Sequence, residues 1–304
     1  YVAKPGIEGD AYRRILNIAH NHADVVRNGT PTHWRRCGGY NLFRFIDGVP
    51  ETPYERRDAG QFNLAQLMTG SEGTLGVMTE FKLNLVPTPK MTALAILHFD
   101  DAYTCLDATQ VVLETGPSAA ELFDSLTMRL CRNHPDYATL LNRFVEGNPD
   151  SILVTEFYGE SESELHDKID KLKNHLIKTG VNVGAIVPLM TPAEQAPVWQ
   201  VRKAGMGLIM SQRGDFKPAT FIEDTAVPVE RLADYITELL DFCKSLNVEM
   251  AYYAHASGGC IHTRPMVNAK SRQDLDKMEQ ISRHTVKLMH KYGGSFSSEQ
   301  DRKS

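Results

Sequence analysis

Two histidines that could bind a metal together lie seven residues apart in the stretch YYAHASGGCIHTRP at 252–265. If the chain turns at the two glycines and returns as a second strand, the imidazoles of His255 and His262 meet across the hairpin. Two imidazoles suit zinc, iron or manganese, and Glu299 or Glu223 would supply the carboxylate ligand. A pair of structural histidines explains the pattern equally well, so both interpretations stay open.

A glycine-rich stretch, GSEGTLG, occupies residues 70–76. Three glycines in seven residues let the backbone approach a ligand closely and direct its N–H groups at a phosphate or carbonyl oxygen. A tight turn between two strands needs glycines as well. The spacing alone does not distinguish a ligand-binding loop from a plain turn.

Five cations form a third candidate set: Arg35, Arg36, Arg202, Lys217 and Arg264. An anionic substrate needs such a group, since a guanidinium binds a carboxylate with two parallel hydrogen bonds. Most arginines of a globular protein are simply solvated at the surface, which is the alternative for each of them.

The elements that must position these residues fall into two parts. Residues 8–27 show apolar side chains at helical spacing, and the alternating stretch 77–86 predicts a strand after the glycine-rich loop. Pro87 and Pro89 then interrupt the chain, and we place a domain boundary near residue 90.

The second part alternates strand-like and helix-like segments with short turns. This pattern predicts an α+β fold in which helices cover one face of a largely antiparallel sheet. The expected strands are 91–99, 119–123, 151–159, 181–189, 219–228 and 248–256, and the expected helices are 101–114, 125–147, 161–179, 229–246 and 271–291.

Composition excludes several classes of protein. The 304 residues are 42% hydrophobic and 23% charged, with a net charge of −5 and no apolar run long enough to span a membrane. The five cysteines contain no C-x-x-C pair, which disfavours an iron–sulfur site. We therefore expect a soluble protein that binds small molecules and has no affinity for nucleic acid. We expect it in the cytoplasm, or peripheral at the inner face of the membrane, and a homo-oligomer is compatible with the sequence.

Five motifs in order resemble the FAD-linked oxidase family of the vanillyl-alcohol-oxidase type, whose members include D-lactate, glycolate and D-2-hydroxyglutarate dehydrogenases. They are RRCGGYNL at 35–42, GSEGTLGVMTE at 70–80, FIEDTAVPVERL at 221–232, YAHASGGCIHTRP at 253–265 and YGGSFSSE at 292–299. The likeness is strongest to the branch in which this unit is fused to an iron–sulfur domain.

The resemblance implies two domains. Residues 1–90 would be the C-terminal part of an FAD-binding half-domain of the PCMH type, and 91–304 a ferredoxin-like cap that closes over the flavin, with the chain truncated at both ends. The glycine-rich loop that surrounds the FAD pyrophosphate in this family has no counterpart here. We therefore expect FAD binding to be weakened or lost.

The implied reaction is oxidation of a D-2-hydroxy acid, with hydride transfer to the flavin and electrons leaving to an acceptor. The family motif continues from the glutamate into a histidine that takes the hydroxyl proton, but Gln300 follows Glu299 here. An amide cannot act as that base.

The resemblance also assigns roles to residues of this chain. It implies that Arg202, Lys217 and Arg264 bind the substrate carboxylate and that Asn41 lies near the flavin. It implies that His255, His262 and Glu299 bind a divalent metal. The residues implied to contact the flavin are Gly70, Ser71, Glu72, Gly73, Thr74, Leu75, Gly76 and Val77. Two other hypotheses remain: a catalytically inactive fragment that acts as a binding or assembly module, and a metal enzyme that uses the histidine pair without flavin.

Overall fold

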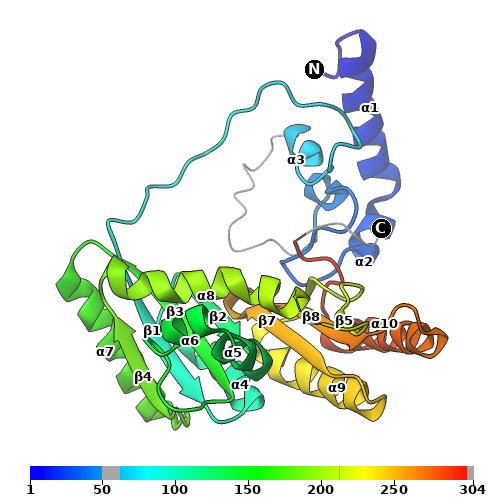
Figure 1. Ribbon diagram of the computed structural model, residues 1–304. Coiled ribbons are helices and arrows are strands. Elements are labelled where there is room, and N and C mark those ends of the chain that lie inside the picture. Colours follow the sequence, from blue (N-terminus) through cyan, green and yellow to red (C-terminus); the bar gives the residue numbers. More distant parts are fainter. Residues whose placement is uncertain (50–61, 212, 300–304) are drawn as a thin grey trace.

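The computed structural model describes residues 1–49, 62–211 and 213–299. Figure 1 shows two parts joined by a long extended segment. A sheet with helices occupies residues 91–299, and short helices and turns from residues 1–49 and 62–76 form the smaller part. Among the described residues, no helix combines the length and the apolar character needed to cross a membrane.

One eight-stranded sheet organises the larger part, and every strand pair in it is antiparallel. The main order is β4-β1-β3-β2-β7-β8-β5, and β6 also pairs with β8. The predicted α+β class with a largely antiparallel sheet is therefore confirmed. The strands are β1 (Met91–Phe99), β2 (Ala119–Phe123), β3 (Ser151–Gly159), β4 (Ala185–Leu189), β5 (Lys217–Pro218), β6 (Thr225–Ala226), β7 (Met250–His255) and β8 (Cys260–Val267).

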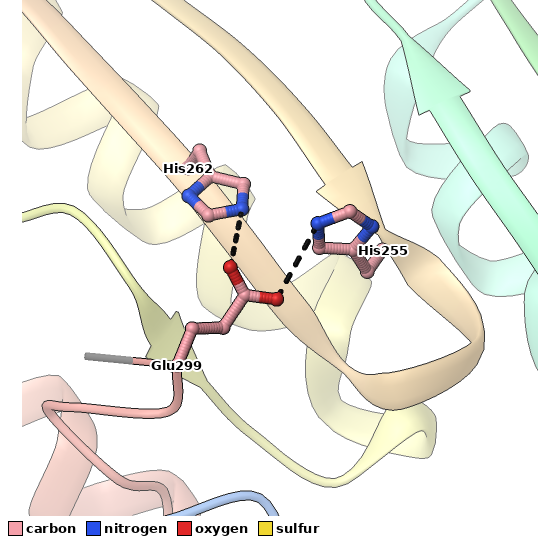
Figure 2. A group of neighbouring side chains, drawn as sticks. All are labelled: His255, His262 and Glu299. Carbon is pink, nitrogen blue, oxygen red and sulfur yellow. Dashed lines mark ion pairs between the residues drawn. The ribbon is translucent and has the colours of Figure 1, made fainter. Parts of the chain in front are cut away.

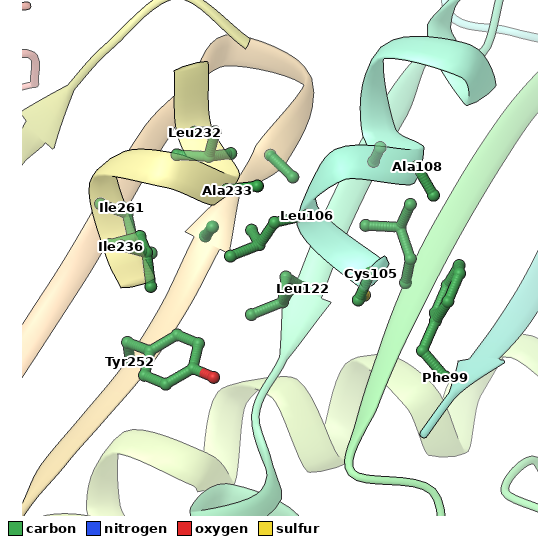
Figure 3. Packing of buried hydrophobic residues seen from close by; sticks show 14 of the residues in the cluster. Phe99, Cys105, Leu106, Ala108, Leu122, Leu232, Ala233, Ile236, Tyr252 and Ile261 are labelled. Carbon is green, nitrogen blue, oxygen red and sulfur yellow. The ribbon is translucent and has the colours of Figure 1, made fainter. Parts of the chain in front are cut away.

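Helices cover both faces of this sheet, whereas the sequence predicted a cover on one. The larger core lies beneath α4 (Ala102–Leu113), α7 (Glu162–Thr179), α9 (Leu232–Ser245) and α10 (Arg272–Tyr292). Figure 3 shows this core around Leu106 and Leu122, two fully buried side chains that each contribute roughly 1.5–3 kcal/mol. On the other face, α5 (Ser125–Arg132), α6 (Pro135–Leu141) and α8 (Pro192–Met210) pack on a second core.

Helix α8 is the main element that the sequence analysis did not predict. Its start carries a full capping box: the Thr191 side chain accepts from the backbone of Glu194, and the Glu194 carboxylate accepts from the Thr191 backbone. Pro192 at the first turn is a further start signal, but Pro197 inside the helix hides the pattern. This helix carries Arg202.

The smaller part contains α1 (Gly6–Asn21) and α2 (Ala23–Gly29), where the sequence predicted one helix over 8–27. The 3-10 turn η1 (Leu42–Phe45) and the short α3 (Ala65–Met68) follow. Phe43, Ile46 and Val49 form its small core. With so little buried apolar surface, this part depends on its contacts with the larger one.

The predicted strand at 77–86 is wrong. These residues are extended but pair with no other described strand, and Val77 and Leu85 are 91% and 82% exposed. An alternating pattern becomes a strand only where a neighbouring strand accepts its backbone hydrogen bonds, and no described residue does so.

The single strand predicted over 219–228 is also wrong. Within this range the structure has only the short β6, since β5 ends before it at Pro218, and Asp224 between the two strands takes a left-handed conformation with φ 66°. Such a conformation is costly for a residue other than glycine and is typical of functional sites.

Candidate functional site

The β7–β8 hairpin brings the two histidines together. Tyr253 pairs with His262 and His255 with Cys260 across the two strands, and the imidazole centroids lie 5.2 Å apart at 87°. The turn contains Gly259 at φ 65°, where an added Cβ would overlap the carbonyl oxygen of Val227. Glycine is therefore required there for the strands to meet in this register.

Glu299 reaches the hairpin through the chain that follows α10. Ser295 forms a β-bridge with Ala226, and Ser298 N–H donates to the Asp224 carbonyl at 3.0 Å. Figure 2 shows the result: the two carboxylate oxygens of Glu299 point at the two imidazoles. Each oxygen lies 3.4 Å from the Nε2 atom of one histidine.

A second carboxylate faces the other ring nitrogen of each histidine. Glu121 Oε1 lies 2.7 Å from His255 Nδ1, and Asp224 Oδ1 lies 2.9 Å from His262 Nδ1. This arrangement turns both Nε2 atoms toward Glu299. Metal-binding histidines are oriented in the same way in known metal sites, where the non-ligating nitrogen donates to a carboxylate or carbonyl.

The cluster is strongly polarised. Burial alone would lower the pKa of His262, but hydrogen bonds to Asp224 and other acceptors raise this pKa far above its usual range. The hydrogen bond from His262 lowers the pKa of Glu299 to about 2, against the opposing effect of burial and with help from His255 and Arg35. The surrounding carboxylates thus stabilise positive charge on the His262 imidazole.

Three of the predicted cations lie beside this cluster. Arg202 donates to Glu121 Oε2 at 3.1 Å and lies 4.6 Å from the centroid of the Tyr253 ring. Arg35 forms an ion pair with Glu299. Arg264 is buried, and its guanidinium pairs with Glu223.

Two other predicted cations lie elsewhere. Lys217 is on β5 opposite Val267, roughly 16 Å along the strand from His262. Arg36 donates to the carbonyl of His33 and lies over the Phe43 ring.

The glycine-rich loop forms a tight, exposed turn. Gly70, Glu72 and Gly73 have positive φ angles of 76°, 49° and 80°, and Thr74 N–H donates to the Ser71 carbonyl at 3.0 Å. Asn41 holds the start of the turn, because its Nδ2 donates to the Thr69 carbonyl at 2.8 Å. Asn41 therefore shapes the loop, and residues 72–77 face solvent.

Sequence reasoning missed three members of the cluster: Glu121, Tyr253 and Asp224. Tyr253 stacks on His262, with centroids 4.6 Å apart. A carboxylate in the apolar strand AAELF was the available signal for Glu121, but only the register of β2 with β7 shows that it faces His255.

Residues 88–299 match the family model described as "FAD linked oxidases, C-terminal domain". The chain belongs to this family. It is 27% identical over 298 residues to a D-2-hydroxyglutarate dehydrogenase of Pseudomonas putida, a match that covers 96% of this chain and 28% of the relative. It is 24% identical over 287 residues to the glycolate oxidase subunit GlcD of Escherichia coli, covering 91% of this chain and 54% of that protein.

The fold agrees with that membership. The solved structure of a 4-ethylphenol oxidase from Gulosibacter chungangensis aligns with a TM-score of 0.51 at 10% identity, over 71% of this chain and 47% of that one. This likeness concerns the fold alone. The match to the family model confirms the family expected from the five motifs. The chain spans about a quarter of the length of the D-2-hydroxyglutarate dehydrogenases it matches.

Proposed function

We propose that this chain is the metal- and substrate-binding portion of a flavin-dependent dehydrogenase for D-2-hydroxy acids. One observation carries the proposal: one ring nitrogen each of His255 and His262 and one carboxylate oxygen of Glu299 lie within 4.8 Å of one another. The names of the relatives supply the class of reaction, since they include a D-2-hydroxyglutarate dehydrogenase and a glycolate oxidase subunit.

The donor atoms fit a divalent metal. Two imidazole nitrogens and one carboxylate oxygen are a ligand set that suits zinc, iron or manganese. Three protein ligands leave a coordination position for a substrate oxygen, and a metal there would polarise the substrate hydroxyl as a Lewis acid. The carboxylates of Glu121 and Asp224 keep both imidazoles aimed at that position.

Arg202 is the best-placed group for the substrate carboxylate. Its side chain is 22% exposed, whereas that of Arg264 is 7% exposed and paired with Glu223. A guanidinium next to the metal ligands would hold the carboxylate while the metal holds the neighbouring hydroxyl oxygen. That two-point attachment matches a 2-hydroxy acid, in which the two groups are on adjacent carbons.

In this proposal, the turn at 70–76 is the part of the chain that contacts the flavin. A bound flavin would accept the hydride and pass the electrons to an acceptor. The chain's contribution is the set of N–H groups in this turn and the buried Ser71 hydroxyl, which has no hydrogen-bond partner among the described residues. Gln300, the residue at the position of the family's base, lies outside the described residues.

Metal binding tests the proposal directly. Calorimetric titration with zinc and with manganese should give a single site in the wild type, and His255→Ala and His262→Ala should each weaken it about 100-fold or more, because each removes one of three ligands. His166→Ala, which alters an exposed histidine of α7 outside the cluster, is the matched control. If both cluster variants bind the metal as tightly as this control, the metal site is refuted.

Substrate class is tested on the metal-loaded chain. D-2-hydroxyglutarate, D-lactate and glycolate should bind to it, and Arg202→Ala should weaken all three because they share the carboxylate. The corresponding compounds without the 2-hydroxyl are the controls, and equal affinity for them would contradict attachment through the hydroxyl.

A further inference from the structure

Glu121 lies at the centre of the cluster although it contacts neither the proposed metal nor the proposed substrate. It is on β2, directly opposite His255 on β7, in the sheet register. Directly opposite residues project from the same face with Cβ atoms about 5 Å apart. The backbone pairing therefore fixes Glu121 beside His255 before any side chain chooses its conformation.

Each oxygen of Glu121 has a different partner. Oε1 lies 2.7 Å from His255 Nδ1, and Oε2 accepts from Arg202 Nη2 at 3.1 Å and Nε at 3.3 Å. The Glu121 side chain is only 14% exposed. A carboxylate this far from solvent is held in place by the groups that neutralise it, so it links β7 to helix α8.

We propose that Glu121 is a positioning residue that holds His255 with its Nε2 atom toward the metal position and holds Arg202 beside it, so that metal ligand and anion-binding group keep one fixed relation. This inference rests on the proposed function and assigns Glu121 a role in it. Asp224 Oδ1 has the equivalent position at the other histidine, 2.9 Å from His262 Nδ1.

The expected effect of Glu121→Gln explains why the negative charge of Glu121 is needed. The amide has one acceptor oxygen for two donors, and Arg202, which can only donate, takes that oxygen. The amide NH2 then faces His255 Nδ1 and forces it to accept, so the imidazole proton moves to Nε2. A protonated Nε2 cannot bind a metal.

The test uses the full chain and two measurements. Glu121→Gln should weaken zinc binding about 10- to 100-fold, the usual effect of removing a carboxylate behind a histidine ligand. Nitrogen-15 spectra of the histidines, recorded without metal at slightly alkaline pH, should show His255 protonated at Nδ1 in the wild type and at Nε2 in the variant. Glu121→Asp, which keeps the charge but withdraws the carboxylate, should also weaken zinc binding.

Glu114→Gln is the matched control, because Glu114 also lies against a histidine, with its Oε2 atom 2.8 Å from His175 Nε2, but at the end of α4 and on α7, outside the cluster. It should leave zinc affinity and the His255 proton unchanged. The inference is overturned if Glu121→Gln matches this control in both measurements. If the wild type binds no zinc, the metal proposal fails while the position of the His255 proton still decides the role of Glu121.

Discussion

At the scale of single residues, Gly259 shows how tightly the hairpin is constrained. Alanine there would have to adopt φ 65° and would overlap the carbonyl of Val227. Gly259→Ala should therefore lower the free energy of unfolding by about 2–4 kcal/mol, from the backbone conformation and the overlap together. Urea unfolding followed by circular dichroism measures the loss.

Gly116→Ala is the matched comparison for this prediction. Gly116 has φ 80°, but no atom lies within 4 Å of an added Cβ. The substitution should cost only the left-handed backbone conformation, about 1 kcal/mol. Equal losses for the two variants would show that the Val227 carbonyl can move aside.

At the scale of elements, Asp124 joins helix α5 to strand β7. It caps α5 by accepting from Thr127 N–H at 3.0 Å, and its other oxygen accepts from Tyr252 N–H at 3.2 Å. Burial raises the pKa of Asp124 to about 6, although these hydrogen bonds oppose the shift. The folded protein therefore holds this proton more strongly than the unfolded chain does.

A pH series tests this linkage. The stabilisation from Asp124 should be fully present below about pH 4 and lost as the pH rises through about 6, because the unfolded carboxyl ionises first. Relative to Asp124→Asn, the wild type should lose about 2–3 kcal/mol of unfolding free energy between these limits. Asp101→Asn, at the exposed cap of α4, controls for loss of a cap charge. A difference that does not vary with pH would contradict the raised pKa.

Local patterns were enough to predict most elements of the larger part. The buried strands β1 and β3 and the helix α7, which ends at Gly180 with φ 73°, have clear signals in the chain itself. The segment 77–86 shows where such patterns fail. Its alternation of apolar and polar residues indicates a preference for strand structure. A strand forms only when another strand pairs with it, and no local pattern reveals that partner.

The residues of the candidate site also fall into those that local sequence predicts and those that only tertiary structure places. His255 and His262 could be predicted because a short hairpin brings them together, so their geometry is a local property. Glu121 could not, because it meets His255 only through the order of strands β2 and β7. The buried pairing of Arg264 with Glu223 likewise depends on tertiary structure, and it leaves Arg202 as the more accessible cation.

For the whole molecule, we expect stability to differ between the extended segment 77–86 and the sheet of the larger part. Amide hydrogens of residues 77–86 should exchange rapidly, since they have no strand partner among the described residues. Those of 151–159 should exchange slowly, because β3 is paired on both sides by β1 and β2. Hydrogen exchange followed by mass spectrometry at low protein concentration compares the two. Equal protection would show that 77–86 is covered in solution.

FAD affinity is a second property of the whole chain. Apart from the buried Ser71, the turn at 70–76 is exposed and offers few donors. Two phosphates require several charge-assisted contacts worth roughly 1.5–3 kcal/mol each. Loss of three such contacts would reduce affinity by several decades. Gel filtration after incubation with FAD should therefore yield a colourless protein. A yellow protein peak would contradict the prediction.

The segment 32–37 joins residues that are very far apart in sequence. His33 Nε2 contacts the Gly258 carbonyl at a separation of 225 residues, and Arg35 meets Glu299 at a separation of 264. Contacts of such range form late in folding, because their loop-closure entropy must be overcome before they contribute stability. Trp34 lies beside the Arg35 guanidinium, so its fluorescence should report this docking after the β7–β8 hairpin has formed. In this order of events, the hairpin that carries both histidines forms first, and residues 32–37 dock against it and against Glu299 later.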